Sequence, residues 1–252
     1  MIDLNAYDAA VLDMDGVITQ SARAHFKAWK NMFDDYLRER AERGDGDFHP
    51  FTEEDYYDYV DGKPRFDGAQ SFLDARGIDL PRGNPDDDPG EEIVCGLGNR
   101  KNELFLDHLE EHGTESYPHA RAFVEEMKRR GKPVAAISSS RNAKAVLEAA
   151  GVLDLFDAIV DGVVSHEMGL EGKPAPDIFL EAARRLDVAP ERSIVVEDAR
   201  AGVEAGRAGG FGLVVGIDRS GENAGLAEHG ADIVVEDLSH IWRKEDDETA
   251  GE

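Results

Sequence analysis

The chain has 252 residues, enough to bury an α/β core and to carry a second, smaller domain. Its composition, with 41% hydrophobic residues, is typical of a globular protein, and no apolar stretch reaches the roughly 20 residues that a membrane-spanning helix needs. The formal net charge of −26, from 54 acidic and 28 basic side chains, argues against nucleic acids and anionic membranes as partners.

The N-terminus, the cysteine count and the acidic runs give three further expectations. Residues 1–5 contain no basic region followed by an apolar stretch, so we expect a cytoplasmic enzyme, and we expect it to be a monomer. The single cysteine, Cys95, excludes an intrachain disulfide and a cysteine-cluster metal site. The acidic runs 86–88 and 245–248 lack the spacing of a calcium loop and are predicted to be solvated, and residues 243–252 are predicted to be a disordered tail.

Residues 20–113 are predicted to form helices without an intervening strand. Apolar side chains recur there at three- and four-residue spacing, and glycines such as Gly44 and Gly77 follow the periodic segments. The predicted helical segments are 21–43, a helix start at 52–55, 66–73 and about 99–111.

From residue 117 onward, short apolar strands alternate with amphipathic helices. The predicted strands are 134–137, 158–160, 194–196, 213–215 and 233–235, and the helices are 118–130, 142–150, 176–186 and 199–208. Such alternation predicts a parallel sheet with right-handed crossovers, and the apolar run 9–12 must join it because it has no other partner. We therefore predict an α/β core, residues 1–19 and 114–252, with a helical cap domain, residues 20–113, inserted after the first strand.

Two carboxylates, Asp13 and Asp15, follow the first predicted strand, where a buried parallel strand would emerge into a catalytic crevice. Asp13, expected at an exposed strand end, could attack phosphorus and form an aspartyl phosphate. Asp15 projects from the same side of the chain and could protonate the leaving oxygen. Gly16 would let the backbone approach the phosphate closely.

A magnesium site is predicted from carboxylates at two strand ends. Mg²⁺ prefers a few carboxylates and retained waters in octahedral geometry. Asp13, the backbone carbonyl of Asp15, and a carboxylate from Glu197 or Asp198 suit that preference. We therefore expect Mg²⁺ as the cofactor.

Ser138 and Lys173 would complete a phosphoryl-transfer site. Lys173 would neutralise the transferring group, and Ser138 could donate a hydrogen bond to it. Each segment alone has an ordinary explanation: a turn, a loop, a surface lysine, or a helix start satisfied by its own amides. Because all of them occur in this order and at strand ends, coincidence is a poor explanation.

The set resembles the haloacid dehalogenase superfamily of phosphotransferases, and within it the β-phosphoglucomutase-like subfamily. The matching segments are Asp13-Met-Asp-Gly-Val-Ile-Thr, His25-Phe-Lys-Ala-Trp29 and Gly-Lys173-Pro-Ala-Pro-Asp-Ile-Phe. The resemblance covers nearly the whole chain, with apparent insertions near residues 39–52 and 84–92. It implies a Rossmann-like core and a helical cap that closes over a sugar phosphate.

The resemblance also implies a role for each matching residue. It makes Asp13 the nucleophile and Asp15 the acid/base, and it places Asp13, the Asp15 carbonyl, Glu197 and Asp198 around the magnesium ion. Ser138 and Lys173 become ligands of the transferring phosphate. The implied substrate-binding residues are His25, Trp29, Gly62, Arg65, Lys101, Ser140, Arg141 and Asn142.

Three of the cap residues separate mutase from phosphatase. His25 and Lys101 match positions that the mutases use to couple substrate binding to cap closure and to Asp15, and Arg65 matches the arginine that holds the distal phosphate. Taken without the resemblance, they would be a helix-face histidine and two surface cations.

Three other positions depart from the mutase pattern. Asp61 replaces a lysine, Gly68 a serine and Gln20 an aspartate. The reversed charge at position 61 leaves the identity of the sugar open.

The leading interpretation is a magnesium-dependent phosphomutase that acts on β-glucose 1-phosphate, or a close sugar-phosphate analogue, through a sugar bisphosphate. A phosphatase on the same scaffold, in which water takes the phosphoryl group, is the alternative. A binding or regulatory module would keep the fold without turnover, but the intact Asp13, Asp15, Lys173 and Asp198 argue against it.

We predict that added salt raises the melting temperature, because screening weakens repulsion among surface carboxylates at a net charge of −26. Melting curves between about 0.05 and about 1 M NaCl measure the effect. The charge fits either a salt-adapted source or an acidic protein from an ordinary habitat. An unchanged or lower midpoint would show that charge repulsion does not limit stability and would remove the salt-adaptation hypothesis.

Overall fold

The computed structural model describes residues 1–219 and 225–242, so the predicted disordered tail, 243–252, lies outside the described residues. Within the described ranges, no helix is long and apolar enough to cross a membrane.

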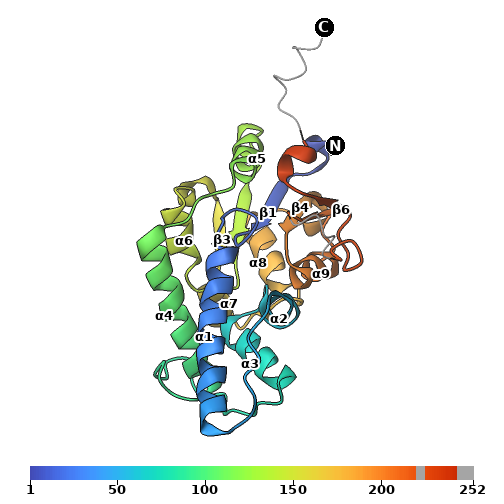
Figure 1. Cartoon of the computed structure of the whole chain (residues 1–252). Helices are drawn as coiled ribbons and strands as arrows, with labels where there is room; N and C mark the ends of the chain where they lie inside the picture. Colours follow the sequence, from blue (N-terminus) through green and yellow to red (C-terminus); the bar gives the residue numbers. More distant parts are fainter. Residues whose placement is uncertain (220–224, 243–252) are drawn as a thin grey trace. The chain divides into compact units, whose positions relative to one another are not determined.

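The chain divides into two compact units, which Figure 1 colours along the sequence. Unit 1 consists of residues 1–20 and the chain from residue 115 onward, and unit 2 consists of residues 21–114. The chain therefore passes between the units twice, after Gln20 and after Thr114.

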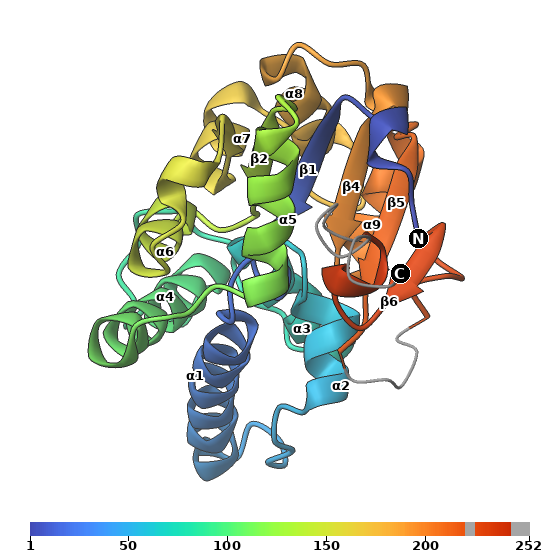
Figure 2. The same cartoon turned by 90° about the horizontal axis from the view of Figure 1, so that it is seen from above.

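Unit 1 is built on a six-stranded sheet whose strand order is β3-β2-β1-β4-β5-β6. Every pair of neighbouring strands is parallel, and Figure 2 shows β1 between β2 and β4. This arrangement confirms the predicted parallel α/β sheet, with the first strand inside it. The strands are β1 (Ala9–Asp13), β2 (Val134–Ile137), β3 (Ala158–Val160), β4 (Ser193–Glu197), β5 (Leu213–Ile217) and β6 (Ile233–Val235).

Helices and short 3₁₀ turns connect these strands. The helices are α5 (Pro118–Arg129), α6 (Ala143–Ala149), α7 (Gly162–Met168), α8 (Asp177–Arg185) and α9 (Arg200–Ala208), and the 3₁₀ turns are Leu4–Ala6, Leu153–Leu155, Pro190–Arg192 and Leu238–His240. Helix α7 was not predicted from the sequence. Asp161 caps it directly after β3 by accepting hydrogen bonds from the amides of Val163 and Val164, and Gly169 ends it in the left-handed conformation.

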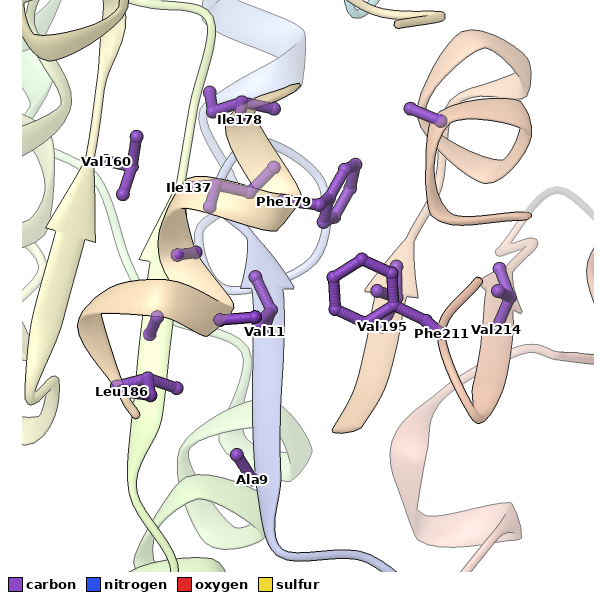
Figure 3. Packing of buried hydrophobic residues seen from close by; sticks show 14 of the residues in the cluster. Ala9, Val11, Ile137, Val160, Ile178, Phe179, Leu186, Val195, Phe211 and Val214 are labelled. Carbon is purple, nitrogen blue, oxygen red and sulfur yellow. The ribbon is translucent and has the colours of Figure 1, made fainter. Parts of the chain in front are cut away.

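One face of the sheet packs against α8 and α9, as Figure 3 shows. Val11, Ile137 and Val195 project from neighbouring strands into this layer. Phe179 of α8 and Phe211 meet there edge to face, with ring centroids 5.9 Å apart. Because these side chains are almost fully buried, the strands that carry the site have a rigid support.

The strand order creates a switch point between β1 and β4. Strands β2 and β3 lie to one side of β1 in the strand order, and strands β4, β5 and β6 lie to the other. In sheets of this kind, ligands bind outside the carboxyl ends of the strands at such a point. Leu12 is in register with Val196, so Asp13 and Glu197 end adjacent strands there.

Unit 2 is helical, with helices α1 (Ala22–Arg43), α2 (Glu53–Asp55), α3 (Arg65–Ala75) and α4 (Val94–His112) and a π-helical turn, Tyr56–Val60. Its core is aromatic: the ring of Phe33 lies 4.2 Å from that of Phe72 and 5.2 Å from that of Phe51, centroid to centroid.

Helix α4 begins at Val94, five residues before the predicted start, so that prediction was wrong. Gly96 and Gly98 made the first turns look unlike a helix, since glycine disfavours helix interiors. The structure explains both glycines: a Cβ atom at Gly96 would overlap the Glu91 carbonyl, and one at Gly98 would lie 2.7 Å from the ring of Phe66.

Helix α5 carries a buried carboxylate with two arginine partners. The Glu126 side chain is 4% exposed and accepts hydrogen bonds from Arg129 (2.8 Å) and Arg130 (2.6 Å). These bonds outweigh burial and lower the pKa of Glu126 to about 2. Glu181 of α8 repeats the arrangement with Arg184 and Arg185.

We predict that Glu126→Gln lowers the free energy of unfolding by about 1–2 kcal/mol at neutral pH, because charge-assisted hydrogen bonds are lost. Since the folded-state pKa is depressed, this contribution is complete above the ordinary value of 4.5 and is lost as the pH falls toward about 2. Urea unfolding from pH 7 to about 3 should show the wild type and the variant converging. Glu125→Gln, at the neighbouring exposed position paired with Arg121, is the control and should cost at most about 0.5 kcal/mol. Equal losses in both variants would contradict the prediction.

Candidate active site

Asp13 and Glu197 lie at the carboxyl edge of the sheet, each as the last residue of its strand. Asp13 is 5% exposed and Glu197 is fully buried. The expectation that Asp13 lies at an exposed strand end was therefore wrong. Helix α9 covers the edge closely, since a Cβ atom at Gly202 would overlap the Glu197 carboxylate.

Lys173 joins these two carboxylates. Its ammonium group donates to Asp13 Oδ1 at 2.5 Å and to Glu197 Oε1. Burial lowers the pKa of Lys173, but the charges of Asp13 and Glu197 outweigh it, so the net direction is upward and the lysine is protonated at neutral pH. The second oxygen of Glu197 accepts the amide hydrogens of Asp198 (2.8 Å) and Ala199 (2.9 Å). Glu197 therefore orients both Lys173 and the turn that carries Asp198.

The donor set fits a magnesium ion. Asp13, Glu197 and Asp198 each offer a carboxylate oxygen, and these oxygens lie within 4.8 Å of one another. All three are hard oxygen ligands, and a single ammonium group faces the two buried carboxylates Asp13 and Glu197. Burial and the charge of Glu197 raise the pKa of Asp13 against the effect of Lys173. A divalent cation at this position would supply the positive charge that the cluster lacks.

The turn after β1 holds Asp15 close to the second strand. Gly16 has φ +82°, and a Cβ atom there would overlap Asp198 Oδ2, so only glycine fits this approach. The Met14 carbonyl accepts hydrogen bonds from the amides of Ile18 (3.0 Å) and Thr19 (2.9 Å), which closes the turn.

The loop after β2 supplies Ser138, which is 1% exposed. Its hydroxyl donates to Asp15 Oδ2 at 3.2 Å and accepts from the amide of Ser140 at 3.0 Å. The Ser140 hydroxyl in turn accepts from the amide of Asn142 at 3.1 Å, and Arg141 between them is exposed. The ends of β1, β2 and β4 and the segment before α8 thus bring together six predicted site residues: Asp13, Asp15, Ser138, Lys173, Glu197 and Asp198.

Unit 2 brings together His25, Trp29 and Lys101. Lys101 is 5% exposed, and its Nζ lies 2.6 Å from His25 Nδ1. An ammonium group at Lys101 can only donate, so it would need Nδ1 as its acceptor. His25 stacks on Phe105 at 4.0 Å, and the Lys101 ammonium lies 5.1 Å from the ring of Trp29.

Arg65 and Gly62 lie at the start of α3 in the same unit, where Gly62 (φ +72°) turns the chain before the helix. Arg65 donates to the side-chain oxygens of Asn99 (3.1 Å) and Asn102 (2.7 Å) of α4. The Asn99 amide nitrogen donates to two backbone carbonyls of the insertion 84–92, at 2.9 Å each. Neither asparagine was predicted as a site residue, although their three-residue spacing on a helix places them on one face.

A doubly wound parallel sheet with an aspartate–lysine–glutamate cluster at its switch point defines an α/β phosphoryl-transfer enzyme. The chain belongs to the haloacid dehalogenase-like hydrolase family, whose pattern matches residues 7–210. This confirms the predicted superfamily.

Relatives carry two kinds of name. A protein named β-phosphoglucomutase from Mycobacterium bovis is 48% identical over 237 residues, which cover 92% of this chain and 90% of the relative. A protein named phosphorylated carbohydrates phosphatase from Thermotoga maritima is 28% identical over 232 residues, 90% of this chain and 94% of the relative. The crystal structure of β-phosphoglucomutase from Clostridium difficile, 23% identical, superposes with a TM-score of 0.74 over 97% of this chain and 96% of that one, which shows a shared fold.

We predict that Lys173→Met lowers the free energy of unfolding by about 3–5 kcal/mol, because it leaves two buried carboxylates without a cation. Asp13→Asn should change it by less than about 1 kcal/mol, since Glu197 then keeps the ammonium group to itself. Urea unfolding in magnesium-free buffer measures both.

Lys128→Met, which breaks an exposed pair with Asp157, is the control and should cost less than about 1 kcal/mol. If Lys173→Met lowers the free energy of unfolding no more than Lys128→Met does, the ion cluster does not stabilise the fold as predicted.

Proposed function

We propose that the protein is a magnesium-dependent β-phosphoglucomutase that acts as a monomer in the cytoplasm. It interconverts β-glucose 1-phosphate and glucose 6-phosphate, or a close sugar-phosphate analogue, through an aspartyl phosphate and a sugar bisphosphate. The cluster of Asp13, Lys173 and Glu197 at the switch point carries the phosphoryl-transfer part of the proposal. The 48% identical relative named β-phosphoglucomutase supports the substrate.

In the proposed reaction, Asp13 is the nucleophile. One of its carboxylate oxygens forms a bond to phosphorus while the bond from phosphorus to the substrate oxygen breaks, and Asp15 gives a proton to that leaving oxygen. In the second half, a sugar hydroxyl gives its proton to Asp15, and its oxygen displaces Asp13 from phosphorus. The hydrogen bond from Ser138 holds the Asp15 carboxyl group in one orientation through both halves.

Charge neutralisation is divided between Lys173 and the metal site. Lys173 stays protonated and is held by two carboxylates, so its charge is already in place when a phosphate arrives. Asp13, Asp198, Glu197 and the Asp15 carbonyl would hold Mg²⁺, which when bound neutralises charge on the phosphoryl group.

The residues of unit 2 favour a mutase over a phosphatase. A mutase must hold a second phosphate during transfer, and Arg65, positioned by two amide oxygens, is suited to bidentate phosphate binding. Lys101 and His25 would couple sugar binding to Asp15. The phosphatase alternative rests on the 28% identical relative named as a phosphatase and on the acidic Asp61 at a position where the mutase pattern has lysine.

We predict that wild-type protein supplied with β-glucose 1-phosphate and a trace of sugar bisphosphate forms glucose 6-phosphate more than about tenfold faster than free phosphate, which corresponds to a barrier difference of about 1.4 kcal/mol. Both products are followed in the same reaction. Free phosphate as the main product, across several sugar phosphates, would establish the phosphatase instead.

Variants test the assigned roles. Asp13→Asn should abolish both activities, and Arg65→Ala should slow both halves of the mutase reaction. Lys101→Met should lower mutase flux more than slow hydrolysis, because it acts on the sugar side. Arg100→Met at the neighbouring position, where the arginine pairs with Asp35 and Glu39, is the control and should leave both rates near wild type. A well-folded Asp13→Asn with wild-type turnover would exclude the covalent mechanism.

A further inference from the structure

Arg219, shortly after β5, reaches the turn that carries Asp15. Its Nη1 donates a hydrogen bond to the Gly16 carbonyl, although part of the side chain is exposed. The guanidinium carbon lies 3.5 Å from the centroid of the Tyr117 ring, which is a close stacking contact. One side chain from the far part of the sequence therefore contacts both the turn after β1 and the segment that enters α5.

A hydrogen bond to the Gly16 carbonyl restrains the conformation of this turn. Gly16 also donates its amide hydrogen to the Thr19 carbonyl at 2.9 Å, so both backbone groups of this residue are held. The peptide planes on either side of Gly16 determine where the Asp15 carbonyl points and where Gly16 meets Asp198. Fixing this carbonyl therefore fixes the placement of two acidic residues of the site.

Tyr117 is tied to the same turn through its backbone. Its amide donates to the Ile18 carbonyl at 2.8 Å, and Gln20 donates to the Glu115 carbonyl at 2.9 Å. Residues 18–20 come directly before the chain leaves unit 1, and residues 115–117 come directly after it returns. Arg219 thus contacts both Gly16 and Tyr117, and the segments 18–20 and 115–117 are hydrogen-bonded to each other.

The carboxylates of Asp198 and Asp237 are near enough to act electrostatically on the guanidinium group. A positive charge beside Asp198 competes with a cation bound by that carboxylate. If charge alone mattered, removing Arg219 would strengthen cation binding, whereas loss of the held turn would weaken it.

We propose that Arg219 is a positioning residue that holds the turn 13–19 in the geometry that phosphoryl transfer needs. It acts through the Gly16 carbonyl and Tyr117 rather than by contact with the reacting atoms. The kinetic consequence rests on the proposed function, whereas the effect on the turn does not.

Three measurements on Arg219→Ala test this role. We expect kcat to fall about 10- to 100-fold with little change in KM, because a small displacement of Asp15 affects the transition state more than substrate binding. Calorimetric titration with Mg²⁺ should show affinity reduced about tenfold, despite the loss of a nearby positive charge. Amide hydrogen exchange should increase in residues 14–20 and 115–117.

Two further variants keep the test decisive. Arg219→Lys retains the charge and one donor but loses the planar stack, so it should recover only part of kcat, and it replaces the alanine variant if that fails to fold. Arg192→Ala removes an arginine from an exposed pair with Asp8 just before β4, at the opposite edge of the same sheet, and is the charge-matched control. It should match wild type in all three measurements.

Wild-type kcat and Mg²⁺ affinity in Arg219→Ala, or an affinity that rises, would overturn the proposal. Full recovery in Arg219→Lys would show that the stack on Tyr117 is not needed and would overturn that part of the proposal. If the wild-type protein converts no sugar phosphate, the proposed function fails, but the Mg²⁺ titration and the hydrogen exchange still decide the role of Arg219.

Discussion

The ammonium group of Lys173, held between the buried carboxylates of Asp13 and Glu197, is the interaction on which the site depends. None of the three side chains would be stable in this position alone, because an isolated charge in a buried environment loses its hydration without compensation. Together they allow the carboxylate of Asp13, the proposed nucleophile, to lie buried at the edge of the sheet. The two carboxylates outnumber the single ammonium group, so the cluster keeps a net negative charge. This charge favours the binding of a metal ion.

Topology explains why residues so far apart in the sequence meet there. Parallel strands point their carboxyl ends toward one edge, and the winding direction of the sheet changes there between β1 and β4. The buried layer beneath it, in which Val11, Ile137 and Val195 lie side by side, keeps the strand ends in fixed register. The chemistry therefore uses loops, and the positions of those loops are determined by the core.

Much of the sheet could be predicted from the sequence because its strands are short apolar runs separated by amphipathic helices. Helix α7 was missed because Asp161 caps it directly after β3, without the loop residues that usually mark a boundary. The early start of α4 was missed because Gly96 and Gly98 are required by close neighbours that local sequence does not reveal.

The candidate site divides in the same way. Asp13, Lys173 and Glu197 were predictable as residue types at strand ends, but the burial of Asp13 depends on three segments meeting in space. Asn99 contacts the Arg65 side chain, and Arg219 contacts the Gly16 carbonyl. Neither contact produces a pattern in the sequence.

The link from the insertion 84–92 through Asn99 to Arg65 has a consequence for conformational entropy. A free arginine side chain has about 2 kcal/mol of rotamer entropy to lose when it is immobilised on a ligand. Here both ends of the Asn99 carboxamide are occupied, one by the insertion and one by Arg65, so the arginine is ordered during folding and not during binding. The insertion thereby lowers the cost of ordering the arginine that we propose for the second phosphate. Changes in its length would alter ligand affinity without touching any residue that contacts the ligand.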